Sequence, residues 1–121
     1  MSDAAPVFDR DHALECLDGD MALLLEIAQM YLTEGPGRLE EIREGLKRRD
    51  APAVEHAAHR LRGSLGALGA SLAADAAQTL ESVAARGDFS RIEDAVAALE
   101  REAARLRPAL ESLIKGEGVR G

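Results

Sequence analysis

The chain has 121 residues with a formal net charge of −7 and an isoelectric point near 4.9. This length suits one domain with a modest core, and the acidic balance argues against nucleic acid as the main partner. Hydrophobic residues make up 46% of the chain but aromatic residues only 2%, so the core must be built from Leu, Ala, Ile and Val.

The N-terminal third predicts a short helix followed by a long one. Asp9 is placed to cap a short helix that runs through about Leu17, and Asp18-Gly19 is typical of a turn. Asp20 then caps the long helix, in which Gly35-Pro36-Gly37 predicts a kink or brief break. The predicted buried face of this helix comprises Leu24, Ile27, Ala28, Tyr31, Leu39, Ile42 and Leu46.

Two further helices are predicted before residue 86. Asp50 caps a third helix, Pro52 is tolerated in its first turn, and Gly69 ends or bends it. Its apolar stripe comprises Val54, Ala57, Ala58, Leu61, Leu65 and Leu68. A fourth helix is expected over about residues 70–85 until Arg86-Gly87 stops it. Its predicted inward residues are Leu72, Ala76, Leu80 and Val83.

The last helix restarts at Asp88 or Ser90, and Pro108 is expected to kink its final turns. Its apolar positions are Ile92, Val96, Leu99, Ala103, Leu106, Leu110 and Leu113. Four substantial helices with short connections predict an all-α fold, an antiparallel four-helix bundle with an additional short N-terminal helix. We expect the domain to span residues 7–114, with flexible termini at 1–6 and 115–121 that include a frayed tail from Gly116 onward.

The cellular location follows from what the sequence lacks. No apolar run approaches the roughly 20 residues of a membrane span, and Met1–Pro6 is short, polar and acidic rather than a secretory signal. Cys16 is the sole cysteine, so no intrachain disulfide can form. Its position near Leu14 and Leu17 predicts a small buried hydrophobic residue. We therefore expect a cytoplasmic protein.

The third predicted helix has an unusual exposed side. At about 100° per residue, His59 lies roughly 140° around the helix from Val54 of the apolar stripe. Gly63 and Gly66 fall on the side that His59 faces, and Arg62 is close enough to bind the same ligand. Glycine inside a helix costs about 1 kcal/mol relative to alanine. The pattern indicates a surface kept clear for something to approach.

Charge is unevenly distributed along the chain. Residues 1–35 contain eight acidic residues and one basic residue, Arg10, whereas residues 47–62 contain five basic and two acidic residues. The basic residues of that segment are Lys47, Arg48, Arg49, Arg60 and Arg62. As a cluster around His59 they favour an acidic partner or a phosphoryl group, although any single one of them is accounted for as a solvated surface charge.

The run from Ala58 to Gly69 resembles the signature of histidine-containing phosphotransfer (HPt) domains. That signature reads His59, Arg60-Leu61, Arg62, Gly63, Ser64 and then Leu68-Gly69 in this chain. The resemblance covers about residues 7–114, and the further matching segments are Asp18-Gly19-Asp20, Lys47-Arg48-Arg49-Asp50, Leu80-Glu81 and Arg86-Gly87-Asp88. One departure is that Arg62 occupies the position at which the family usually has lysine.

The resemblance implies specific roles. His59 is the phospho-accepting residue through the ring nitrogen farther from the backbone, and Arg62 is the cationic neighbour that stabilises the phosphate. Gly63 permits docking, and Glu81 matches the position that orients the histidine ring, although an ordinary exposed helix acid accounts for it equally well. A neutral imidazole is nucleophilic, and its ordinary pKa of about 6.5 leaves much of it neutral near pH 7.

The resemblance also implies partners. A relay of this kind passes a phosphoryl group between a histidine kinase or hybrid kinase and the receiver-domain aspartates of response regulators. The chain lacks a glycine-rich phosphate loop, so we expect a carrier without its own kinase activity. We also expect this carrier to be a monomer. We expect no metal or cofactor on this chain, and Mg²⁺ on the receiver. The expected partner-binding residues are His56, Arg60, Gly63, Gly66 and Lys47.

Other functions remain open from the sequence. The same surface suits a binding module that blocks a receiver or kinase without carrying phosphate. The Ala-rich faces suit a structural bundle that self-associates. His59 is accounted for less well as an idle surface residue, and its spacing from His56 allows a zinc pair, for which Glu55 is the one further acidic ligand nearby.

Overall fold

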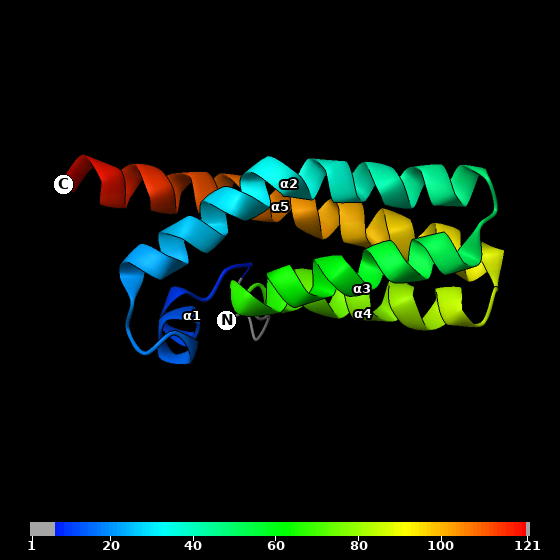
Figure 1. Ribbon diagram of the computed structural model, residues 1–121, viewed down its shortest axis with the longest axis horizontal. Coiled ribbons are helices and arrows are strands. Elements are labelled where there is room, and N and C mark those ends of the chain that lie inside the picture. The colour runs from blue at the N-terminus through cyan, green and yellow to red at the C-terminus, as the bar shows by residue number, and fades with distance from the viewer. Residues whose placement is uncertain (1–6, 121) are drawn as a thin grey trace, which may run out of the picture.

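The computed structural model describes residues 7–120, with side chains through residue 116, and shows helices without strands in this part of the chain (Figure 1). The helices are α1 (Arg10–Cys16), α2 (Met21–Lys47), α3 (Ala51–Ala67), α4 (Ser71–Ala85) and α5 (Phe89–Arg120). In Figure 1, α2 and α5 lie along one side of the bundle and α3 and α4 along the other, each antiparallel to the next. The predicted four-helix bundle with a short N-terminal helix is confirmed.

Aspartate side chains begin four of the helices, as the sequence predicts. Asp9, Asp20 and Asp50 each accept a hydrogen bond from the backbone amide three residues on, at 3.0, 3.0 and 3.2 Å. Asp88 accepts from the Ser90 hydroxyl at 3.0 Å and from a backbone amide at 3.4 Å. The Ser90 hydrogen bond is the main cause that lowers the pKa of Asp88. These side chains satisfy amide groups that the first turn of a helix leaves unpaired.

The Gly-Pro-Gly segment bends α2 without breaking it. The helix is continuous through Pro36, and its ribbon changes direction about midway along its length (Figure 1). Gly35 is buried, and a Cβ atom there would lie 3.1 Å from Tyr31 Cε1. Burial of Tyr31 raises the pKa of its hydroxyl. The glycine therefore makes room for the chain's one tyrosine within the core.

The core follows the predicted stripes, with one change of register. All the predicted apolar positions of the α3 and α5 stripes are buried. On α2, the predicted Ile27, Leu39 and Leu46 are only half-buried. On α4, the predicted Leu80 and Val83 are buried, but Leu72 and Ala76 are only half-buried. Ala73 and Ala77 take the central positions instead. Alanine at these positions lets α4 pack closely against α3 and α5, which hydrophobicity alone does not indicate.

The prediction that Cys16 is buried is wrong. Cys16 ends α1 and is exposed, with its Sγ 3.8 Å from His12 Nε2. Helix α1 has only seven residues and buries Ala13 alone. A helix this short presents one small contact to the bundle, so the described part of the bundle leaves the side that carries Cys16 exposed.

Helix α5 continues through Pro108 to Arg120 and so extends past residue 114, where the predicted domain ends. The predicted flexibility of residues 115–121 stays a prediction. Gly121 and the predicted flexible segment 1–6 lie outside the described residues. Within residues 7–120, no helix combines the length and apolar character needed to cross a membrane.

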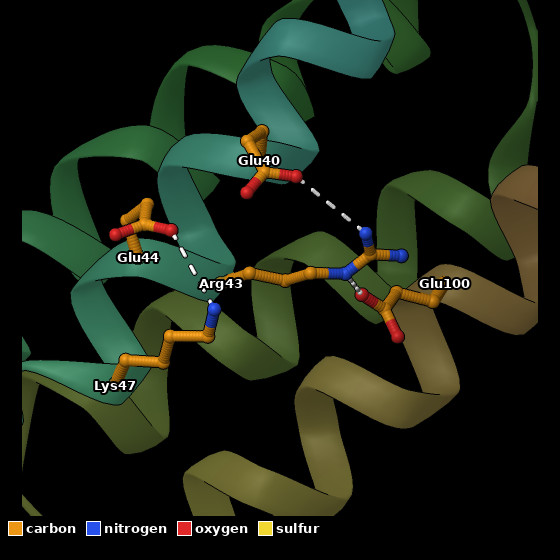
Figure 2. Close-up of polar contacts among 5 residues, drawn as sticks. All are labelled: Glu40, Arg43, Glu44, Lys47 and Glu100. Atoms are coloured by element: carbon orange, nitrogen blue, oxygen red, sulfur yellow. Dashed lines mark hydrogen bonds and ion pairs between the residues drawn. The ribbon is translucent and has the colours of Figure 1, made fainter.

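Charged side chains connect α2 and α5 (Figure 2). Arg43 on α2 hydrogen-bonds through Nε to the Glu100 carboxylate on α5, and its Nη1 lies 3.6 Å from Glu40. The hydrogen bond to Glu100 is the main cause that raises the pKa of Arg43. Because these groups are exposed, we assign them to the orientation of the helices rather than to much of the stability.

The α3–α4 turn is held against the N-terminal segment at Gly69. Its φ angle is +70°, and a Cβ atom there would lie 2.9 Å from the Asp9 carbonyl oxygen. The Asp9 amide also donates to the Gly69 carbonyl at 3.3 Å. A side chain would therefore meet an unfavourable backbone conformation and a backbone oxygen together.

We predict that Gly69→Ala lowers the free energy of unfolding more than Gly87→Ala does. Gly87 has a φ of +72° but open space around its Cβ position, so its variant should lose only the conformational term of about 1–2 kcal/mol. Gly69→Ala should lose at least about 1 kcal/mol more through overpacking. Urea denaturation of both variants measures the difference, and equal losses would contradict the packing argument.

Candidate functional site

His59 lies near the middle of α3, on the side that faces α4. Its side chain is 57% exposed. Its Nδ1 atom is 2.9 Å from Oε2 of Glu81, which is on α4 and only 23% exposed. The antiparallel packing of α3 and α4 brings together two residues that are 22 positions apart. The carboxylate thereby fixes the orientation of an otherwise exposed imidazole ring.

Arg62 completes this cluster from the next turn of α3. Its Nη2 atom is 3.1 Å from His59 Nδ1, and its Nε atom is 3.0 Å from Glu81 Oε1. The Nε atom is buried without a hydrogen bond, because its N–H group does not point at that oxygen, so the contact with Glu81 is ionic. We call His59, Arg62 and Glu81 the histidine cluster. Its guanidinium lies on the Nδ1 side of the ring.

A shallow hollow of about 480 Å³ lies between α3 and α4 beside the cluster. It is lined by His59, Arg62, Gly63, Gly66, Ala67, Ala74, Asp75 and Gln78. A Cβ atom at Gly63 or Gly66 would meet no atom of the chain within 4 Å. The packing of the chain therefore does not require glycine at either position, and both leave the hollow open.

The sequence interpretation missed Asp75 and Gln78. Both line the hollow from α4. With Glu81 they follow a three-residue spacing, which places polar side chains along one face of a helix. This spacing is a signal that could have identified them.

Arg60 faces a different hollow from His59. It lines a hollow of about 300 Å³ between α2 and α3, together with Met30 and Arg38. Met30 is 57% exposed and Leu23 is 39% exposed, which makes them the large exposed hydrophobic residues of the described chain. The sequence interpretation missed both. Their signal is that they are apolar residues off the predicted buried stripe of α2.

The remaining predicted partner-binding residues, Lys47 and His56, do not line the hollow beside the cluster. Lys47 ends α2, and its Nζ atom is 3.7 Å from Glu44 Oε2 (Figure 2). His59 follows the start of α3 by about 12 Å along the helix axis. His56 is exposed one turn before His59. No group of three metal-ligating side chains occurs among the residues that the structure describes.

Comparison with known proteins identifies the family and the fold. The family model described as the Hpt domain matches residues 26–109, which include all of α3 and α4 and the histidine cluster. The chain belongs to the Hpt domain family. An Hpt domain of known structure, histidine-containing phosphotransfer protein B (HptB) from Pseudomonas aeruginosa PAO1, is 28% identical, with a TM-score of 0.83. The match covers 93% of this chain and 97% of that one. No curated protein matches this Hpt sequence.

These matches confirm the predicted family and activity. The chain is a histidine phosphotransfer protein of a two-component phosphorelay, and Hpt proteins work as phosphocarriers with kinases and response regulators.

Proposed function

We propose that His59 is the residue that carries the phosphoryl group, and that it does so on Nε2. The observation that supports this most is the hydrogen-bond arrangement of the ring. Nδ1 contacts Glu81 and Arg62, whereas Nε2 has no hydrogen-bond partner among the described residues. An exposed ring whose other nitrogen is already engaged offers Nε2 to an incoming group.

Glu81 prepares the ring for transfer by accepting the Nδ1 proton at 2.9 Å. A neutral ring with its proton on Nδ1 carries its lone pair on Nε2. That lone pair attacks the phosphorus of a receiver's aspartyl phosphate. The N–P bond forms as the P–O bond to the aspartate breaks, which frees the aspartate carboxylate. The ring keeps its Nδ1 proton and becomes positively charged, and the Glu81 carboxylate stabilises that charge.

The hollow admits the receiver domain, and Arg62 binds the phosphoryl group that the receiver brings. Gly63 and Gly66 let the receiver bring its aspartate in line with Nε2, because phosphoryl transfer depends chiefly on positioning and charge stabilisation. Arg62 supplies a permanent positive charge to the phosphoryl oxygens once it turns from Glu81 toward them. Side chains outside this hollow, at His56, Arg60 and Lys47, set receiver preference.

The chain as a whole acts as a monomeric carrier without its own kinase activity, in the cytoplasm. It requires no cofactor, and the Mg²⁺ of the reaction belongs to the receiver. Its partners are receiver domains of response regulators and a histidine kinase or hybrid kinase.

The experiment that tests the proposal is phosphoryl transfer from a panel of phosphorylated receiver domains, with the modified residue mapped by mass spectrometry under non-acidic conditions. We expect label on His59 alone, with His12 and His56 as internal controls. Label on either control would contradict the assignment. A folded chain that binds a receiver but takes no label would instead indicate a binding module that blocks its partner.

A further inference from the structure

The Nδ1 atom of His59 has two neighbours that require opposite protonation states. A carboxylate can only accept a hydrogen bond, so the contact with Glu81 at 2.9 Å requires a proton on Nδ1. A guanidinium can only donate, so the contact with Arg62 Nη2 at 3.1 Å requires a lone pair on Nδ1. One neutral ring has one such proton, so the two hydrogen bonds cannot exist together.

Each hydrogen bond therefore selects one tautomer of the ring. With the proton on Nδ1, the ring donates to Glu81 and Nε2 holds the lone pair. With the proton on Nε2, the ring accepts from Arg62 and Nε2 is no longer a nucleophile. Each of these hydrogen bonds includes one charged group, which makes both of them strong. Their type alone therefore does not decide which tautomer is more populated.

The planar fork of arginine makes this competition possible. Arg62 contacts Glu81 through Nε while Nη2 reaches the ring, so the same side chain binds the competing carboxylate and the disputed nitrogen. The ion pair also draws electron density of Glu81 away from Nδ1, which weakens the acceptor for the competent tautomer. Both contacts of Arg62 therefore favour the tautomer with the proton on Nε2.

We propose that Arg62 holds part of the His59 population in the tautomer that cannot accept a phosphoryl group, and that a docked receiver releases this hold by drawing the guanidinium toward its phosphoryl oxygens. Arg62 is then a positioning residue before transfer and a phosphate ligand during it. The release step rests on the proposed function of His59, whereas the effect of Arg62 on the free protein does not.

Long-range ¹H–¹⁵N correlation spectra of the unphosphorylated full chain report the tautomer of each histidine. They are recorded at pH 8, above the ordinary imidazole pKa of about 6.5. Arg62→Met keeps an unbranched, flexible side chain of similar apolar character to the arginine stem but removes its donors and its charge. We expect this variant to raise the ratio of the Nδ1–H to the Nε2–H form at His59 by about tenfold, equivalent to about 1.4 kcal/mol. Glu81→Met should change the ratio in the opposite direction.

Arg60→Met is the matched control, because it removes an arginine from the same helix but from the other hollow. We expect it to leave the ratio unchanged, with His12 and His56 as further controls within each spectrum. An unchanged or lower ratio in Arg62→Met, or an equal change in Arg60→Met, would overturn the proposal. Circular dichroism verifies that each variant is folded.

The release step is tested with a receiver domain loaded with beryllofluoride, which mimics its phosphoryl group. Its addition should bring the wild-type ratio to that of Arg62→Met, and a wild-type ratio that stays at its free value would overturn the release. If the ratios behave as expected but mass spectrometry finds no phosphoryl group on His59, the assignment of His59 fails while the hold by Arg62 stands.

Discussion

Replacement of His59 by glutamine is expected to abolish phosphoryl acceptance and leave the bundle folded. Glutamine has an amide in place of the imidazole and offers no nucleophilic nitrogen, so the loss should be complete rather than partial. The side chain of His59 is 57% exposed and lies outside the core. Removal of its contacts with Glu81 and Arg62 should change the free energy of unfolding by no more than about 1 kcal/mol.

The measurement combines label transfer from a phosphorylated receiver with thermal unfolding monitored by circular dichroism. His12→Gln is the matched control, because it changes an exposed histidine on α1, outside the proposed docking surface. It should keep its capacity to accept label. Persistent labelling of the His59→Gln variant would show that another residue carries the phosphoryl group.

Local features of the sequence predicted the helices well. Asp9, Asp20, Asp50 and Asp88 bind backbone amides within three residues of themselves, so the information that begins each helix is contained in its first turn. The bend of α2 is also encoded locally, because Pro36 within Gly35-Pro36-Gly37 removes a backbone hydrogen bond of the helix. Helix ends and bends of this kind need no knowledge of the neighbouring helices.

Features that depend on packing between helices were harder to predict. The exposure of Cys16 depends on how little of α1 the bundle covers, and the central position of Ala73 depends on how closely α4 approaches α3. The same holds within the site. Spacing along α3 placed His59 beside Arg62, but only the packing of α4 shows that Glu81 contacts both the ring and the guanidinium.

The pair Gly63→Ala and Gly66→Ala is expected to stabilise the protein and impair transfer at the same time. Each methyl group would meet open space within the chain, so each substitution should raise the free energy of unfolding by about 1 kcal/mol through helix propensity. The same methyl groups would enter the hollow in which we place the receiver. We expect the second-order rate of transfer from a phosphorylated receiver to fall by about tenfold, the equivalent of about 1.4 kcal/mol.

Urea denaturation and the transfer rate are measured on the same preparations of the double variant. Gly37→Ala is the matched control, since Gly37 also lies within a helix with open space at its Cβ position but does not line this hollow. It should gain stability without loss of transfer. A double variant that transfers at the wild-type rate would contradict a receiver at this surface. Opposite changes in stability and transfer would mean that these glycines serve the partner, because a role in the fold would make both properties fall together.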